Sequence, residues 1–412
     1  MNYRHNIEII NNEALGYFKE YTLHSVFQPI YSFAHAEPVG YEALLRATNS
    51  MGENIPPVKL FSTVDNDNDE LLKLEQLSRS LHLLNFDRQN TGDALLFLNI
   101  NPHLIDNNNN SMKQLIEILH DYNISPRQIV IEIVEELVCE YDNLVSQIQY
   151  LKMNGCMLAI DDFGAGHSNF NRIWDLNPDI VKLDKAMIKR LKTSSDFLRP
   201  FSSLVELLHG SGALVLIEGV EDEEDAELAH DMDVDFHQGY FFAHPVRELS
   251  LLKNVYNPYL TKPFQDKLAT RITPRSSTLP EHLEFLFNEI ATSVQFDNSL
   301  KHYCERLLNH PRVLCCYLLD DQGYQIADKL YGYHATQLSS SHHRALDKNQ
   351  QDNWSRRSYY QRAMASPMTI QISRPYKSLT NLGMCVTLSI AVEMKRKLNI
   401  LCCDITWQDI KN

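Results

Sequence analysis

The chain has 412 residues, of which 44% are hydrophobic and 22% are charged, and its formal net charge is −15. This length exceeds one ordinary hydrophobic core, so we expect two domains, and the composition is typical of a globular protein rather than a disordered one. The acidic balance argues against binding to polymeric DNA or RNA or to an anionic membrane. It still allows a small phosphorylated ligand, because a bound metal ion can supply positive charge locally.

The first twenty residues are polar and lack the apolar core of a signal peptide, and no apolar run in the chain is long enough to cross a bilayer. The eight cysteines include the adjacent pairs Cys315–Cys316 and Cys402–Cys403, both in apolar runs, and there is no CxxC motif. We therefore expect a cytoplasmic protein whose cysteines are reduced and buried. A redox or metal-binding role for them is the less favoured alternative.

Between about residues 26 and 245, short apolar runs alternate with longer helical patterns. The runs are VGYEALL, ALLFLNI, QIVIEIV, CMLAI, DIVKL and ALVLI. The stretch DELLKLEQLSRSLHLLNF repeats leucine at spacings of three and four, which is typical of a helix. This alternation predicts parallel strands in an α/β architecture, and the number of units favours a closed (β/α) barrel over an open sheet.

The character of the chain changes after this region. Residues 257–280 contain Pro258, Pro263 and Pro274 and are expected to form a linker. The segment EHLEFLFNEIATSV then predicts an amphipathic helix. Strands are predicted at VLCCYLL, YQIA, MTIQIS, GMCVTLSIAV and LNILCCDI, and DDQG is the expected turn between the first two. We therefore expect a first domain over residues 1–256, a linker over 257–280 and a smaller α+β domain over 281–412.

Acidic, amide or lysine side chains lie at or near the end of six successive predicted strands. They are Glu42, Asn99, Glu132, Glu135, Asp161, Asp162, Lys182, Asp184 and Glu218. A single acid at a strand end is usually structural, but in a parallel barrel these ends converge on one face. Gathering so many carboxylates without a cation would cost several kcal/mol. We therefore expect a binuclear divalent site. An all-oxygen ligand set suits Mg²⁺ or Mn²⁺, and the absence of clustered His and Cys argues against zinc.

Eight short motifs follow one another in a recognisable order. They are QPI at 28–30, EALLR at 42–46, NINP at 99–102, EIVE at 132–135, DDFGAGHS at 161–168, KLD at 182–184, EGVE at 218–221 and QGYFFAHP at 238–245. With these motifs the chain resembles the EAL-domain phosphodiesterases, which hydrolyse cyclic di-GMP to linear pGpG. The resemblance implies a modified TIM (β/α)8 barrel.

The resemblance also assigns roles to matching positions. It implies that two divalent cations, Mg²⁺ or Mn²⁺, are held by Glu42, Asn99, Glu132, Asp161, Asp162 and Glu218. Lys182 would hold or polarise the attacking water, Glu218 would complete the metal shell, Glu135 would anchor the loop 162–168, and Gln238 would position the nucleophile or substrate. The implied substrate contacts are Gln28, Glu42, Leu45, Arg46, Asp184, Gln238, Gly239 and Pro245.

Val134, His167, Asn169 and Ile217 depart from residues frequent in the family, but none of them replaces an implied metal ligand or the lysine. The expected function is therefore hydrolysis of cyclic di-GMP. One alternative is a catalytically weak or inactive receptor that binds the dinucleotide and signals through a protein partner. Another is a metal-dependent barrel enzyme acting on a carboxylate substrate, which would not account for the QPI and QGY segments. The resemblance further implies a homodimer formed through the barrel.

The segments NWSRRSYYQRAM, ISRPYKSLTN, VTLSIAV and LCCDI resemble the PAS/Cache-like sensor fold. Trp354, Arg357, Tyr359 and Tyr360 either line a pocket for an unidentified small ligand or are ordinary core and surface residues. Both interpretations stay open at this point. A sensor domain here would act on the loop 162–168 across the linker near Pro274.

Overall fold

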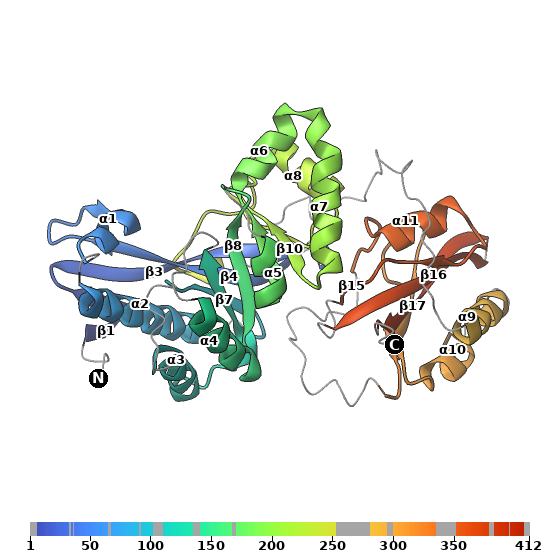
Figure 1. The fold of residues 1–412 in the computed structure, drawn as a ribbon, viewed down its shortest axis with the longest axis horizontal. Coiled ribbons are helices and arrows are strands. Elements are labelled where there is room, and N and C mark those ends of the chain that lie inside the picture. The colour runs from blue at the N-terminus through green and yellow to red at the C-terminus, as the bar shows by residue number, and fades with distance from the viewer. Residues whose placement is uncertain are drawn as a thin grey trace.

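The structure is a computed structural model. It describes residues 6–32, 34–35, 37–64, 67–89, 92–101, 110–134, 141–166, 170–252, 281–294, 300–334, 352–378, 383–394 and 396–407. The predicted linker, Glu135 and residues 167 and 168 of the loop 162–168 lie outside these residues. The described part of the chain contains two β-sheets, one of which closes into a barrel (Figure 1).

Eight strands form the closed barrel, in the order β3-β11-β10-β9-β8-β7-β6-β4, with β4 pairing back to β3. Their bounds are β3 Tyr21–Ser32, β4 Glu37–Thr48, β6 Leu95–Asn99, β7 Ile129–Val134, β8 Met157–Phe163, β9 Ile180–Leu183, β10 Leu214–Ile217 and β11 Phe236–His237. The pairings from β4 through β6 and on to β11 are parallel, which confirms the predicted α/β barrel.

Strand β3 departs from the expected parallel arrangement, because it runs antiparallel to both β4 and β11. The connection between β3 and β4 has only a few residues, and so short a connection can join antiparallel strands but not parallel ones. This is the feature that modifies the barrel relative to a regular alternation of strand and helix.

Helices cover the outside of the barrel (Figure 1). They are α1 Pro57–Ser62, α2 Asn68–Arg88, α3 Asn110–Asp121, α4 Tyr141–Met153, α5 Phe170–Leu176, α6 Lys185–Thr193, α7 Leu198–Gly210 and α8 Glu223–Asp231. Asp67 caps α2, since its side chain accepts the backbone N–H groups of Asp69 and Glu70. The apolar faces of the helices pack against outward-pointing strand residues such as Ile131 and Val181 in one continuous core.

Three short strands that flank the barrel sheet were not predicted from the sequence. β1 Ile7–Ile10 and β2 Glu13–Phe18 form an antiparallel hairpin that extends the sheet beyond β3, and β5 Asn54–Ile55 pairs with the far end of β4. These segments are short and partly exposed, so they lack the strong apolar pattern from which strands are predicted.

The second sheet is antiparallel, in the order β13-β12-β17-β16-β14, with β15 also paired to β16. Its strands are β12 Val313–Leu319, β13 Leu330–Tyr331, β14 Gln371–Ile372, β15 Tyr376–Lys377, β16 Met384–Met394 and β17 Lys397–Thr406. Helices α9 Glu281–Val294 and α10 Leu300–Leu308 pack on one face, and α11 Ser358–Ala365 packs on the other. The structure therefore agrees with the predicted α+β arrangement.

The prediction of a strand over YQIA is wrong. Tyr324 and Gln325 form only isolated bridges, because the carboxylate of Asp320 accepts the backbone N–H of Tyr324 at 2.8 Å and holds the turn closed. The predicted strand MTIQIS is reduced to β14.

The seven described cysteines are all buried and none forms a disulfide, which agrees with the prediction of reduced cysteines. Within the described residues, no helix has both the length and the apolar content that a bilayer-spanning helix requires.

Candidate metal centre and active site

The alternation of side chains along the barrel strands explains why the charged residues converge. On β7, β8 and β9, the residues Val130, Ala159 and Ile180 point into the barrel interior, whereas their neighbours point outward to the helices. Because side chains alternate with a period of two, the next inward positions are Glu132, Asp161 and Lys182. The carboxyl ends of parallel strands therefore gather these charges at one mouth of the barrel.

Lys182 lies in the middle of the gathered carboxylates. Its Nζ is 2.7 Å from Glu132 Oε1, 2.7 Å from Glu218 Oε1 and 3.0 Å from Asp161 Oδ1. Glu42 Oε2 is slightly farther away, at 3.7 Å. The Lys182 and Glu132 side chains are almost completely buried, so these ion pairs are shielded from solvent and salt.

Glu42 is held from two sides by amide groups. Asn99 Nδ2 donates to Glu42 Oε1 at 3.0 Å, and Gln238 Nε2 donates to Glu42 Oε2 at 2.6 Å. These three residues come from β4, from β6 and from the turn after β11. The hydrogen bonds fix the Glu42 carboxylate at the mouth of the barrel beside Lys182.

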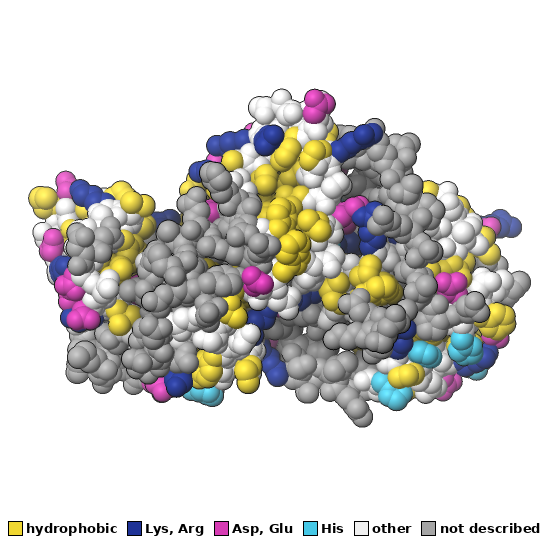
Figure 2. Space-filling view, viewed as in Figure 1, with side chains coloured by type: hydrophobic (Ala, Val, Ile, Leu, Met, Phe, Trp, Pro, Cys, Tyr) yellow, Lys and Arg dark blue, Asp and Glu magenta, His cyan; other side chains and the backbone are white. Residues whose placement is uncertain are grey.

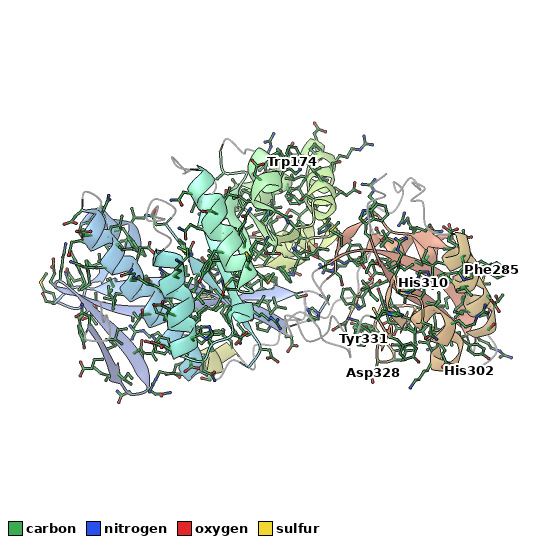
Figure 3. All side chains as sticks on the ribbon, turned by 60° about the horizontal axis from the view of Figure 1, so that its bottom comes forward. Trp174, Phe285, His302, His310, Asp328 and Tyr331 are labelled. Carbon is green, nitrogen blue, oxygen red and sulfur yellow. The ribbon has the colours of Figure 1, made fainter. Side chains whose placement is uncertain are left out.

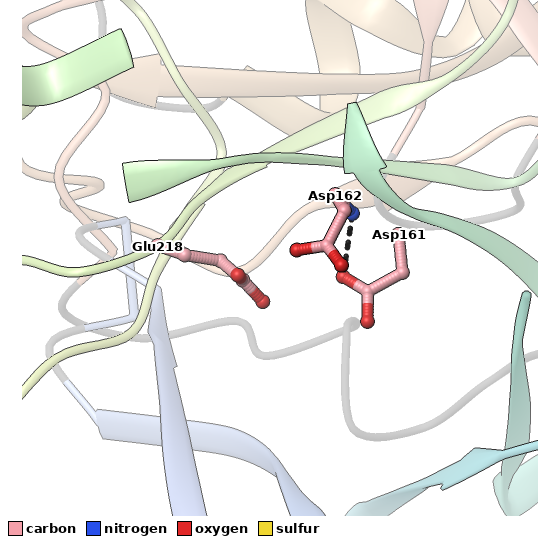
Figure 4. A group of neighbouring side chains, drawn as sticks. All are labelled: Asp161, Asp162 and Glu218. Atoms are coloured by element: carbon pink, nitrogen blue, oxygen red, sulfur yellow. Dashed lines mark hydrogen bonds between the residues drawn. The ribbon is translucent and has the colours of Figure 1, made fainter. Parts of the chain in front are cut away.

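Asp161, Asp162 and Glu218 form the tightest group of carboxylates in the described part of the chain. One oxygen of each lies within 4.8 Å of one oxygen of the other two. Figure 4 shows the three side chains pointing toward one another, with the Asp162 N–H donating to Asp161 Oδ1 at 3.0 Å. Asp162 has a φ of +55°, a left-handed conformation in which a non-glycine residue is strained. Such strain is found where a site requires a particular side-chain direction.

The electrostatics reflect an excess of negative charge. Burial, with Asp161 and Glu42 nearby, raises the pKa of Glu218 to about 7, even though Lys182 acts to lower it. Burial likewise raises the pKa of Glu132 well above its usual range, and burial together with Asp161 raises that of Asp162. Burial alone would lower the pKa of Lys182, but the surrounding carboxylates outweigh it and raise that pKa well above its usual value. Lys182 therefore stays protonated and positively charged at neutral pH.

The residues present fit divalent cations. A single ammonium group cannot neutralise Glu42, Glu132, Asp161, Asp162 and Glu218, and carboxylate oxygens are the ligands that Mg²⁺ and Mn²⁺ prefer. Glu132 Oε1 lies 2.7 Å from Lys182 Nζ, whereas its buried Oε2 has no hydrogen-bond partner among the described residues. Of the predicted strand-end residues, the structure brings together Glu42, Asn99, Glu132, Asp161, Asp162, Lys182 and Glu218. The excess negative charge of this group is of the kind that cations relieve.

The predicted substrate contacts come from several different segments of the barrel. Gln28 on β3 faces Glu42 across the strand pair, and Leu45 and Arg46 follow on β4. Arg46 Nη1 donates to the Leu45 carbonyl at 2.9 Å. The Asp184 carboxylate accepts the N–H of Ala186 at 2.8 Å, so in the described contacts it caps α6.

Gly239 supports the site in a way that the motif alone does not reveal. A Cβ added to Gly239 would lie 2.0 Å from the carbonyl oxygen of Val220, so only glycine fits there. Val220 and Gly239 directly follow the segments that carry Glu218 and Gln238, and their close packing joins these two segments. Pro245 ends the same motif, half-buried, one residue before Val246 pairs with Phe27 of β3.

Two buried aspartates near the opposite ends of the strands were missed by the sequence analysis. Asp179 and Asp235 precede β9 and β11 and accept backbone N–H groups of β8 and β10. Their carboxylates look like ordinary turn residues in the sequence, because their basic partners are distant in the chain. Asp179 pairs with Lys152 of α4 and with Lys377 of the second domain. Asp235 pairs with His209 of α7 and with Arg357 of the second domain.

Comparison with known proteins identifies the family of the chain. The family described as "EAL domain" matches residues 12–245, which is more than half of the chain. The protein therefore belongs to the EAL-domain family.

Among curated relatives, the oxygen sensor protein DosP of Escherichia coli (strain K12) is 27% identical over 228 residues, covering 54% of this chain and 28% of DosP. The cyclic di-GMP phosphodiesterase RocR of Pseudomonas aeruginosa is 31% identical over 136 residues, covering 33% of this chain and 35% of RocR. The chain thus spans about a third or less of the length of these relatives. The uncharacterized EAL-domain containing protein YkuI of Bacillus subtilis (strain 168) is 25% identical over 321 residues, covering 74% of this chain and 76% of YkuI.

Solved structures share the barrel. A standalone EAL protein from Vibrio cholerae O395, in its cyclic di-GMP bound form, is 25% identical with a TM-score of 0.51 and covers 58% of this chain and 98% of its own. Klebsiella pneumoniae BlrP1, solved as a manganese and cyclic di-GMP complex, is 24% identical with a TM-score of 0.50, covering 55% of this chain and 56% of its own. The second comparison bears on the fold alone.

Proposed function

We propose that this protein hydrolyses cyclic di-GMP to linear pGpG with the help of two divalent cations, Mg²⁺ or Mn²⁺. The observation that carries the proposal is the ring of buried carboxylates around Lys182 at the mouth of the barrel. Its relatives support it, since RocR is a cyclic di-GMP phosphodiesterase and the Vibrio cholerae protein was solved with cyclic di-GMP.

The proposed metal ligands are Glu42, Asn99, Glu132, Asp161, Asp162 and Glu218. When bound, the cations would lower the pKa of a bound water and neutralise charge on the phosphodiester. Glu42 has its orientation fixed by Asn99 and Gln238, so it is preorganised for this task. The proposed anchoring of the loop by Glu135 falls outside the described residues.

Lys182 is proposed to orient the attacking water as a hydrogen-bond donor. Its raised pKa keeps it protonated at neutral pH, which suits a donor and not a proton acceptor. Gln238 is proposed to position the water or the substrate, because its Nε2 is bound to Glu42 while its buried Oε1 accepts no hydrogen bond from a described residue. Gln28, Leu45, Arg46, Asp184, Gly239 and Pro245 are proposed to line the dinucleotide site.

The direct test is to incubate the full chain with cyclic di-GMP and Mn²⁺ and to separate the products by chromatography. Appearance of pGpG, abolished by a chelator, supports the proposal. Binding of the dinucleotide without cleavage would instead identify a receptor that signals through a partner. Absence of binding would contradict both functions.

The second domain is proposed to be a PAS/Cache-like sensor that modulates the barrel. Its antiparallel sheet with helices on both faces supports this assignment, and the match to YkuI covers more of the chain than the barrel does. Trp354, Arg357, Tyr359 and Tyr360 are all buried, and Tyr359 accepts a hydrogen bond from Tyr317 at 3.1 Å. Arg357 faces the barrel through Asp233 and Asp235, so a small ligand on this domain would have to be recognised by other residues.

A further inference from the structure

The second domain reaches the barrel at the end opposite the metal centre, through two basic side chains. Lys377 Nζ is 2.7 Å from Asp179 Oδ1, and Arg357 Nη2 is 2.6 Å from Asp235 Oδ1. All four side chains are buried. Each aspartate also has a basic partner within the barrel, since Asp179 lies 3.3 Å from Lys152 Nζ and Asp235 lies 2.8 Å from His209 Nε2. Breaking a buried ion pair is costly, so Lys377 and Arg357 add a constraint on these aspartates from the side of the second domain.

Each aspartate is also bonded to a strand of the barrel. Asp179 Oδ2 accepts the backbone N–H of Leu158 on β8 at 2.9 Å, and Asp235 Oδ2 accepts that of Val215 on β10 at 2.8 Å. Asp161 lies three residues after Leu158, and Glu218 lies three residues after Val215. Three residues of extended chain span roughly 10 Å. The interdomain ion pairs therefore hold the same two strands that present Asp161 and Glu218.

The second domain in turn holds both basic side chains firmly. The Arg357 guanidinium lies over the Tyr376 ring, 5.7 Å from its centroid, and Lys377 is the next residue after Tyr376. Tyr376 Oη shares a hydrogen bond of 2.6 Å with Thr387 Oγ1, which donates to the buried Asp404 at 2.7 Å. The ion pairs thus connect the polar core of the second domain to the barrel strands.

Further contacts make the docking specific. Arg356 Nη1 donates to the Val234 carbonyl at 2.7 Å, and the Asn353 N–H donates to the Ala34 carbonyl at 2.8 Å. Arg374 pairs with Glu206 on α7, but both of these side chains are about half exposed and neither is bonded to a barrel strand. That exposed pair crosses the same interface without touching β8 or β10, so it provides a matched control.

We propose that Arg357 and Lys377 are positioning residues for the metal centre: through Asp235 and Asp179 they hold β10 and β8 in the position that aligns Glu218 with Asp161. The inference rests on the proposed function in that this centre binds divalent cations. It places the second domain's influence at the strands themselves rather than at the loop 162–168.

The test uses the full chain with the substitutions Arg357→Met and Lys377→Met, the conservative Arg357→Lys and Lys377→Arg, and the control Arg374→Met. Mn²⁺ binding is measured by electron paramagnetic resonance without substrate, and kcat and KM are measured with cyclic di-GMP. Circular dichroism shows that each variant is folded. We expect the two Met variants to bind Mn²⁺ about five- to tenfold more weakly, and we expect kcat to decrease by a larger factor than KM changes. The conservative variants should recover part of the Mn²⁺ affinity and of kcat. Arg374→Met should match the wild type.

Folded Met variants that bind Mn²⁺ with wild-type affinity would overturn the proposal, because the ion pairs would then serve docking alone. If a Met variant does not fold, its conservative partner decides, since Arg357→Lys and Lys377→Arg should still weaken Mn²⁺ binding measurably. Weakened Mn²⁺ binding in a protein that never cleaves cyclic di-GMP would support the positioning role and refute the proposed hydrolysis. Normal cleavage of cyclic di-GMP with unchanged Mn²⁺ binding would refute the positioning role and support the proposed hydrolysis.

Discussion

At the scale of single residues, Lys182 has an unusual position, because one buried ammonium contacts carboxylates from four different segments of the barrel. It balances part of their charge and, in the proposed function, orients water. Its loss would affect both roles. Gly239 acts differently, since it contributes only the absence of a side chain where two segments of the site meet.

The substitution Lys182→Met should lower turnover of cyclic di-GMP by about a hundredfold or more, the scale expected when a group that positions a proton transfer is lost. Mn²⁺ should raise the melting temperature of this variant more than that of the wild type, because the metal then replaces missing positive charge. Lys192→Met is the control, since Lys192 of α6 pairs with Asp222 and Asp225 at the start of α8 and not with the carboxylates around Lys182. Wild-type turnover in Lys182→Met would show that the lysine has another role.

The substitution Gly239→Ala should destabilise the protein by about 1–3 kcal/mol, the usual cost of overpacking, because the new methyl group would overlap the Val220 carbonyl. Turnover should fall as Gln238 and Glu218 are displaced. A Cβ at Gly210, at the end of α7, meets no atom within 4 Å, so Gly210→Ala serves as control in thermal unfolding and activity assays. Equal melting temperatures for the two variants would contradict this packing argument.

The gathering of charged side chains could be predicted from the sequence where the pattern is local. Asp161, Lys182 and Glu218 could be found because they end apolar runs, and period-two alternation turns them to the same side. Asp179 and Asp235 could not be found, since their interdomain partners, Lys377 and Arg357, come from more than a hundred residues away. The requirement for Gly239 likewise depends on the Val220 backbone, a contact that no spacing in the sequence encodes.

At the scale of elements, the barrel strands were predictable and the added hairpins were not. Strong apolar runs correspond to β6 through β10, whereas β1 and β2 are short and partly exposed. Helix α2 shows a further limit, because it buries polar residues that a helical pattern assigns to the surface. His82 of α2 shares hydrogen bonds with Ser25 Oγ at 2.8 Å and with Ser78 Oγ at 3.1 Å.

This buried histidine makes stability depend on pH. Burial, with a smaller effect of Arg46, lowers the pKa of His82 to about 3. Below about pH 6.5 the unfolded chain binds a proton at this ring that the folded protein does not, so stability falls as the pH falls toward 3. Melting temperatures should therefore decrease from pH 7 to pH 5, and His82→Gln should flatten that decrease. The variant should also be less stable at pH 7, since it loses both hydrogen bonds.

His120→Gln on the exposed part of α3 is the matched control, and it should keep the wild-type pH dependence. An unchanged slope in His82→Gln would mean that other groups account for the acid sensitivity.

At the scale of the whole molecule, the barrel and the second domain pack side by side, and buried side chains from both belong to one cluster (Figure 1). The sequence predicted both architectures but not their docking, which depends on ion pairs between distant segments. The predicted boundaries at 256 and 281 stay predictions, because the intervening residues lie outside the described part. Figure 2 shows hydrophobic side chains gathered on the barrel face that carries α5 to α7. Trp174 belongs to α5 and is 60% exposed.

We propose that this face forms the predicted homodimer. Figure 3 shows Trp174 at the edge of the barrel, whereas Phe285, His302 and His310 lie on the second domain. The substitution Trp174→Glu should shift the protein toward the monomer in sedimentation velocity, because it places a charge in an apolar contact. Phe285→Glu, at a position that is 67% exposed on α9, should not change the sedimentation coefficient. A monomeric wild type, or a dimer unaffected by Trp174→Glu, would exclude this interface.

The most direct measurement is a single-turnover reaction with the full chain in excess over cyclic di-GMP and with Mn²⁺ present, compared with Asp161→Asn under the same conditions. Single turnover separates binding from the chemical step. The carboxylate ring predicts that the wild type converts all of the dinucleotide to pGpG in one exponential phase, and that Asp161→Asn binds it but leaves it intact. Uncleaved cyclic di-GMP on a folded, Mn²⁺-loaded wild type, or equal cleavage by Asp161→Asn, would contradict the account.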